Sequence, residues 1–331
     1  MKRRSAARLL SGLLATGAAS PAATFAETAP PVQTYVEAPG PLGPLKGTML
    51  APASGVAPVV LIIPGSGPTD RDGDNRYGVK ARTYRLLAEG LVARGVATVR
   101  IDKRGMFASA AAVTDGNDVT IGDYASDVET WAASIRKQTG APCIFVLGHS
   151  EGGLVALAAA QKASDICGLL LVAPPGRPLA DILREQLKAN PANAPILDQA
   201  LAATADLERG KRVDTTKMNP ALMPLFAPQV QGFLINVFSF DPAKLIAQVS
   251  TPVLILQGER DLQVSVADAE RLKDAAPKAK LVLLPDVNHV LKTVSSDDRR
   301  LNAATYADPS LPLAPGVVDA IADFVTTAKA R

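Results

Sequence analysis

The chain contains very few histidine, cysteine and aromatic residues. Its 331 residues include two His, two Cys and one Trp, and aromatic side chains make up 4% of the composition. The Cys and His residues lack the paired spacings of a zinc site, so we expect no structural zinc. The low aromatic content argues mildly against a site that stacks carbohydrate rings. Two histidines also leave few candidates for a general base.

Basic residues open the chain. Residues 1–26 combine a basic start at 2–4, a short apolar run (Leu9–Ala19) and small residues that end in Thr24-Phe25-Ala26. This pattern is typical of a secretory signal peptide cleaved after Ala26. The apolar run is shorter than the roughly 20 residues that a membrane-spanning helix needs.

Removal of residues 1–26 changes the charge balance. The chain then has 31 bases and 32 acids, so the net charge of +3 becomes −1. A protein without a basic excess has no electrostatic reason to bind nucleic acid or an anionic membrane. We therefore expect a secreted or periplasmic protein with no nucleic-acid partner and no stable membrane insertion after signal cleavage.

The two cysteines, Cys143 and Cys167, each open an apolar run that we interpret as a core strand. They are either buried thiols or a disulfide between neighbouring strands in an oxidising compartment. Because a disulfide requires strict geometry, we expect free thiols.

Short apolar runs alternate with helical patterns over most of the chain. Residues 27–45 are rich in Pro, Gly and Ala and are expected to form a linker, followed by one domain over 46–331. Predicted strands cover 59–63, 96–101, 143–147, 168–172, 253–257 and 280–284, and predicted helices cover 84–93, 121–136, 154–162 and 317–328. The alternation predicts a mostly parallel sheet covered by helices on both faces.

One long segment interrupts this alternation. Residues 176–245 contain no convincing strand, and helical spacing covers 179–188 and 196–207. The segment begins at the carboxyl end of a strand, where ligands of open α/β sheets bind. We therefore expect a helical cap over the active edge; the alternative is an extra packing layer with no role in substrate choice.

Ser150 lies in the pentapeptide Gly148-His149-Ser150-Glu151-Gly152, between a predicted strand and a predicted helix. A strand that turns sharply into a helix needs glycines beside the serine, and it holds the hydroxyl at the helix N-terminus. This context predicts that Ser150 is a catalytic nucleophile, the alternative being an ordinary glycine-rich turn.

A serine nucleophile needs a base, and the base needs an orienting acid. His149 is next to the nucleophile, so we expect its side chain to point elsewhere, which leaves His289 as the base. Asp261 follows a predicted strand and lies between Ser150 and His289 in the chain. We predict that Asp261 is the acid, with Glu259 as a rival and Asp286 as a weaker one.

The tetrahedral oxygen of acyl transfer needs two N–H donors. We expect the first to be the backbone N–H of Glu151, directly after the nucleophile. The second should come from the loop that follows the strand at 59–63, and we assign it to Ser66, with Gly67 as the alternative.

Two further patterns point away from metals and dinucleotides. Residues 70–74 place acids at alternate positions like a calcium loop, but Asn75 and Ala81 stand where that loop needs Gly and Glu. No G-x-G-x-x-G follows the first predicted strand. We expect neither a bound metal nor a dinucleotide cofactor.

These motifs together resemble the α/β-hydrolase superfamily and, more narrowly, bacterial hydrolases of the serine aminopeptidase S33-like (hydrolase-4) group. The similarity covers roughly residues 45–330 and is carried by Gly65–Gly73, Asp102–Gly105, Gly148–Gly152, Gly258–Asp261 and Asn288-His289. It implies an eight-stranded sheet, a cap after the sixth strand and acyl hydrolase activity without a cofactor. It also implies triad roles for Ser150, Asp261 and His289, and oxyanion-hole roles for Ser66 and Glu151. Family members often have His-Gly before the oxyanion residue, whereas this chain has Pro64-Gly65.

The leading functional prediction is a carboxylesterase-like serine hydrolase that cleaves a small-molecule acyl substrate through an acyl-enzyme. A peptidase or an acyltransferase could use the same three residues. A non-catalytic binding protein is the remaining alternative, and the complete Ser, His and Asp set argues against it.

Overall fold

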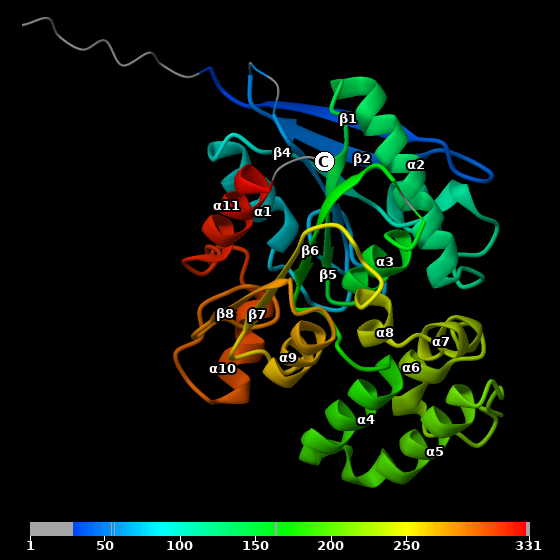
Figure 1. Cartoon of the computed structure of the whole chain (residues 1–331). Coiled ribbons are helices and arrows are strands. Elements are labelled where there is room, and N and C mark those ends of the chain that lie inside the picture. The colour runs from blue at the N-terminus through cyan, green and yellow to red at the C-terminus, as the bar shows by residue number, and fades with distance from the viewer. Residues whose placement is uncertain (1–28, 54, 56, 163, 329–331) are drawn as a thin grey trace, which may run out of the picture.

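The computed structural model describes residues 29–53, 55, 57–162 and 164–328. The expected signal peptide, residues 1–26, lies outside the described residues. The strands of the central sheet are β1 (Val32–Ala38), β2 (Leu45–Ala51), β3 (Val59–Ile63), β4 (Ala97–Ile101), β5 (Ile144–His149), β6 (Ile166–Val172), β7 (Val253–Gly258) and β8 (Lys280–Leu284). They lie in the order β1-β2-β4-β3-β5-β6-β7-β8 (Figure 1). The pairs β1–β2 and β2–β4 are antiparallel and the others are parallel, as the sequence predicts for most of the sheet.

The linker expected at 27–45 is wrong for Val32–Ala38, which form β1. This strand pairs with β2 from Val32 opposite Ala51 to Ala38 opposite Leu45. Val36 and Ala38 are buried, whereas Tyr35 is 84% exposed because β1 is an edge strand. An edge strand has few buried positions, so its apolar alternation is weak, and the surrounding Pro and Gly residues hide it further.

Helices cover both faces of the sheet. Their bounds are α1 (Thr83–Ala93), α2 (Ile121–Thr139), α3 (Glu151–Ala159), α9 (Val266–Ala275), α10 (Arg299–Ala304) and α11 (Val317–Thr327), with 3-10 turns at Phe107–Ala112 and Thr305–Ala307. Because side chains alternate along a strand, Val60 and Ile62 of β3 pack in one core with α1 and α11. Leu61 and Ile63 pack in a second core on the opposite face, with α2 and α3.

The segment between β6 and β7 is helical, as expected. It contains α4 (Leu179–Ala189), α5 (Leu197–Glu208), α6 (Met223–Phe226), α7 (Gln231–Phe238) and α8 (Pro242–Ile246), with 3-10 turns at Pro191–Ile196 and Pro220–Leu222. Figure 1 shows α4 to α7 grouped beyond the end of the sheet at which the chain leaves β6. This group of helices is called the cap below.

Ion pairing fixes the base of the cap. The Arg177 guanidinium donates to both carboxylate oxygens of Asp268, with N–O distances of 2.8 and 2.7 Å. Asp268 is buried in the first turn of α9, so the entry to the cap is tied to the helix that follows β7.

No single helix among the described residues is long and apolar enough to cross a bilayer, although Pro220–Phe226 and Gln231–Phe238, bent by 60°, meet those criteria as a pair.

The expectation of free thiols is wrong, because Cys143 and Cys167 form a disulfide with a Cα–Cα distance of 5.3 Å. Cys143 directly precedes β5 and Cys167 is the second residue of the adjacent strand β6. The pairing of these strands shifts register between Ile144 and Phe145, which leaves Cys167 without a directly opposed residue. The register of neighbouring strands is set by the folded sheet and is not visible in the sequence.

Removal of this disulfide should lower stability without changing the fold. The bridge joins residues 24 apart. We expect Cys143→Ala/Cys167→Ala to lower the free energy of unfolding in urea by about 3 kcal/mol, because the unfolded chain regains the freedom of a closed loop. Dithiothreitol should lower the unfolding free energy of the wild-type protein by a similar amount and leave that of the double variant unchanged. Equal unfolding free energies for the double variant and the disulfide-bonded wild-type protein would contradict the expectation.

Candidate active site

Ser150 occupies a strained turn between β5 and α3. Its backbone has φ 54° and ψ −125°, and its N–H donates to the Val172 carbonyl at 2.9 Å. The flanking chain is tightly packed: a Cβ at Gly148 would lie 2.1 Å from the Gly152 carbonyl oxygen, and a Cβ at Gly152 would lie 2.5 Å from that of Ile63. Only glycine fits at either position. The pentapeptide therefore forms the strand-turn-helix that a nucleophile requires.

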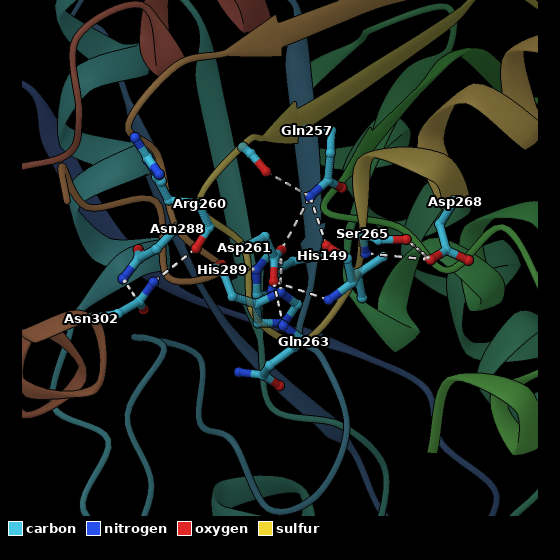
Figure 2. Close-up of polar contacts among 12 residues, drawn as sticks. His149, Gln257, Arg260, Asp261, Gln263, Ser265, Asp268, Asn288, His289 and Asn302 are labelled. Atoms are coloured by element: carbon cyan, nitrogen blue, oxygen red, sulfur yellow. Dashed lines mark hydrogen bonds and ion pairs between the residues drawn. The ribbon is translucent and has the colours of Figure 1, made fainter. Parts of the chain in front are cut away.

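The loops after β7 and β8 bring Asp261 and His289 together (Figure 2). The His289 Nδ1 lies 2.7 Å from Asp261 Oδ2, and their side chains are 6% and 0% exposed. An ionised carboxylate only accepts hydrogen bonds, so Nδ1 carries the proton. The Nε2 lone pair of His289 is then available for proton transfer.

Asp261 is held as an ionised acceptor by several donors. Its Oδ1 accepts the backbone N–H groups of Gln263 and Val264 at 2.7 and 3.0 Å, and Oδ2 also accepts from Gln257 at 3.2 Å. Burial acts to raise the pKa of Asp261, but His289 and these hydrogen bonds hold the pKa below its ordinary value.

The two rival acids lie elsewhere. Glu259 is exposed, and Asp286 pairs with Arg260 at 3.3 Å. Of the three candidates, only Asp261 is hydrogen-bonded to His289 among the described residues. The described hydrogen bonds include none between the Ser150 hydroxyl and His289; such bonds commonly form fully only when substrate is bound.

Sequence reasoning set His149 aside as the base but did not foresee that its ring lies beside that of His289. The two ring centroids are 4.8 Å apart, and His149 Nε2 lies 2.8 Å from the His289 carbonyl oxygen. A carbonyl only accepts, so Nε2 carries the proton and Nδ1 accepts from the Tyr84 hydroxyl at 2.9 Å. Burial mainly, and the nearby His289 to a smaller extent, lower the pKa of His149 to about 3, so the ring stays neutral at pH 7.

Tyr84 extends this chain of bonds to the loop after β3. Its hydroxyl oxygen accepts the Gly65 N–H at 2.9 Å, so Gly65, Tyr84, His149 and the His289 backbone form one buried series. Sequence reasoning missed Tyr84 because it lies on α1, 65 residues from His149. A buried tyrosine on an amphipathic helix carries no local signal for such a role.

The two expected oxyanion donors belong to two segments that adjoin Ser150. Glu151 is the first residue of α3, where N–H groups lack an intrahelical partner. Ser66 belongs to the loop 64–68 that follows β3, and a Cβ at the preceding Gly65 would lie 3.2 Å from the Ser150 Cβ. Within the described part of the chain, no protein acceptor takes the N–H of Ser66.

The acidic side chains at 70–74 are hydrogen-bonded or ion-paired to other residues of the chain. The Asp70 Oδ1 accepts the backbone N–H groups of Asp72, Gly73 and Asp74 at 2.8 to 2.9 Å, and Asp72 pairs with Arg100. The described residues contain no group of three His, Cys, Asp or Glu side chains that could hold a metal ion. These carboxylates stabilise the turn at 70–74, which follows the loop 64–68.

The chain is similar to known proteins in sequence and in fold. Residues 75–293 match the profile of the family described as serine aminopeptidase, S33 (Hydrolase_4). Esterase EstD of Thermotoga maritima is 27% identical over 259 residues, which cover 75% of this chain and 58% of that protein. This chain therefore spans little more than half the length of that curated relative.

Solved structures share the fold at low identity. Est1E from Butyrivibrio proteoclasticus has a TM-score of 0.55 and 18% identity, over 90% of this chain and 99% of its own. A thermophilic esterase from Thermogutta terrifontis has a TM-score of 0.53 and 20% identity, over 89% and 99%. The α/β-hydrolase fold expected from the sequence is confirmed.

The choice of Asp261 over Glu259 can be tested through the reactivity of Ser150. Asp261→Asn should slow labelling of Ser150 by a fluorophosphonate on the order of 10³-fold or more, because the amide no longer fixes the His289 tautomer. The matched change Glu259→Gln, on an exposed side chain of the same loop, should leave the labelling rate unaltered. A larger loss for Glu259→Gln than for Asp261→Asn would reassign the acid.

Proposed function

Since this chain belongs to the serine aminopeptidase S33 (Hydrolase_4) family, we propose that it hydrolyses carboxylic esters through an acyl-enzyme on Ser150. The observation that carries the proposal is the shielded bond between Asp261 and His289 at the same sheet edge as the Ser150 turn. A hydroxyl at a helix N-terminus, together with a base that has one nitrogen free, suits acyl transfer.

Acylation begins when the Ser150 Oγ attacks the acyl carbon and His289 Nε2 takes the hydroxyl proton. The imidazolium keeps its Nδ1–H bond to Asp261, whose charge stabilises it. The carbonyl oxygen becomes an oxyanion that accepts the N–H groups of Glu151 and Ser66. His289 then gives its proton to the departing alcohol oxygen, and the acyl group remains on Ser150.

Deacylation repeats these steps with water. His289 Nε2 takes a proton from water, whose oxygen attacks the acyl carbon of the ester on Ser150. The oxyanion returns to the same two donors, and collapse of the intermediate releases a carboxylic acid while His289 returns the proton to Ser150.

The comparisons favour esters over peptides as substrates. The matched relative from Thermotoga maritima is an esterase, and one solved structure of Est1E has ferulic acid bound. Peptide hydrolysis and acyl transfer to an alcohol become outcomes of the experiment below.

Kinetics with p-nitrophenyl esters of increasing chain length test the proposal. The protein should release p-nitrophenol, and Ser150→Ala should lower kcat by at least about 10⁴-fold because the nucleophile is lost. A fluorophosphonate should label the original protein and not Ser150→Ala. Turnover of peptides alone, or of esters only when a second alcohol is supplied, would replace hydrolysis of esters by peptidase or acyltransferase activity. Equal rates for Ser150→Ala would remove the proposal altogether.

We further propose that the protein acts outside the cytoplasm. The basic and apolar start of the chain supports export, and so does the Cys143–Cys167 disulfide, because such bonds persist mainly in oxidising compartments. The second observation is independent of the first.

Expression of the full chain in a bacterial host tests export. The periplasmic fraction should contain a protein that begins at Glu27, as read by N-terminal sequencing, with no free thiol. Leu13→Arg, which places a charge in the apolar run, should keep the full-length chain in the cytoplasm. The proposal would be overturned if the wild-type protein stayed in the cytoplasm at full length with its cysteines reduced.

A further inference from the structure

Lys103 is a buried cation that the catalytic steps above leave unused. It follows β4, its side chain is 2% exposed, and it lies 3.3 Å from the Glu151 carboxylate, which is 3% exposed. Its Nζ also donates to the Gly65 carbonyl oxygen at 2.7 Å. One ammonium group therefore contacts both segments that carry the expected oxyanion donors.

The contact with Gly65 determines the direction of the next N–H. The carbonyl of Gly65 and the N–H of Ser66 belong to one peptide group, and that peptide bond is trans. In a trans peptide the C=O and N–H bonds point in opposite directions. With its carbonyl held by Lys103, this peptide directs the Ser66 N–H away from the ammonium.

A flipped peptide would be unfavourable while Lys103 is present. Rotation of the Gly65–Ser66 peptide would turn its N–H toward the ammonium and remove the carbonyl from its charged donor. Hydrogen bonds to charged groups are stronger than neutral ones, especially where water is excluded. Tyr84 holds the same residue from its other side through the Gly65 N–H at 2.9 Å.

We propose that Lys103 is a positioning residue that sets the oxyanion hole: its ammonium holds the Gly65 carbonyl so that the Ser66 N–H faces the reacting oxygen, and it ties this loop to Glu151. The proposal rests on the ester hydrolysis proposed above. It assigns Lys103 no contact with substrate and no proton transfer.

A purely structural role predicts different behaviour, and the neighbouring residue provides the comparison. Arg104 forms a second buried pair with Asp127, at 2.6 and 3.0 Å, and attaches the same loop to α2. This pair contacts neither Gly65 nor Glu151 among the described hydrogen bonds. Its loss should weaken the fold and leave catalysis intact.

The test compares Lys103→Met/Glu151→Gln with Glu151→Gln. Both variants avoid an unpaired buried carboxylate, and they differ only in the ammonium. With p-nitrophenyl acetate, the double variant should have a kcat about 10²-fold below that of Glu151→Gln, with KM changed less than about threefold, because a misdirected donor acts in the transition state. Its affinity for a boronic acid that forms a tetrahedral adduct on Ser150 should fall by a similar factor.

Two further variants separate geometry from charge and from stability. Lys103→Arg keeps the positive charge beside Glu151 but moves the donors, so kcat should fall at least about tenfold, since a planar fork cannot replace a single ammonium. Arg104→Met/Asp127→Asn should lower Tm and keep kcat. Lys103→Arg also serves as the test if the double variant does not fold.

The outcomes distinguish this proposal from the proposed function. An original protein without Ser150-dependent turnover refutes ester hydrolysis itself. A second result is that the wild-type protein turns over esters while a folded Lys103→Met/Glu151→Gln variant has a kcat within about threefold of that of Glu151→Gln. This result refutes the role of Lys103 and leaves ester hydrolysis standing, since the loss of an oxyanion donor lowers kcat far more. An unaltered kcat in Lys103→Arg, or an equal loss of kcat in Arg104→Met/Asp127→Asn, refutes it as well.

Discussion

The close packing around Ser150 is the constraint on which the rest of the site depends. Side chains at Gly148 and Gly152 would collide with neighbouring carbonyl oxygens, so β5, the start of α3 and the end of β3 approach one another without intervening side chains. This contact brings the loop after β3 beside the nucleophile and leaves the N–H of Glu151 at a helix N-terminus. A strained backbone at Ser150 persists because the surrounding elements determine its position.

The sequence predicts those parts of the fold whose signal is local. The bounds of β3 and β8 were predicted as observed, because the aliphatic residues of each strand are consecutive: five in β3, and four after Lys280 in β8. β1 was missed because an edge strand buries only part of its length. The disulfide was missed because it depends on the register of β5 and β6, which is a property of the folded sheet.

The candidate site divides in the same way. The sequence predicts Ser150 from its motif, His289 from the small number of histidines, and Asp261 from its place in the chain between the other two. Excluding Glu259 as the acid required the direction in which the loop after β7 turns. The bonds of His149 to Tyr84 and to the His289 backbone join three distant segments. No spacing in the sequence contains that information. A buried neutral histidine beside the predicted base also places a fixed dipole there without adding a second charge.

The three charged residues that follow β4 show how buried charge supports a site that these residues do not form. Asp102, Lys103 and Arg104 are all buried, and each holds a different segment. Asp102 accepts the backbone N–H of Arg71 at 3.0 Å in the acidic loop, Lys103 holds Gly65 and Glu151, and Arg104 binds α2. A buried charge that loses its partner is left uncompensated, so each of these side chains constrains where its partners lie. For Lys103 this constraint is positional at the site itself: its ammonium holds Gly65 and Glu151, and this arrangement sets the loop beside Ser150.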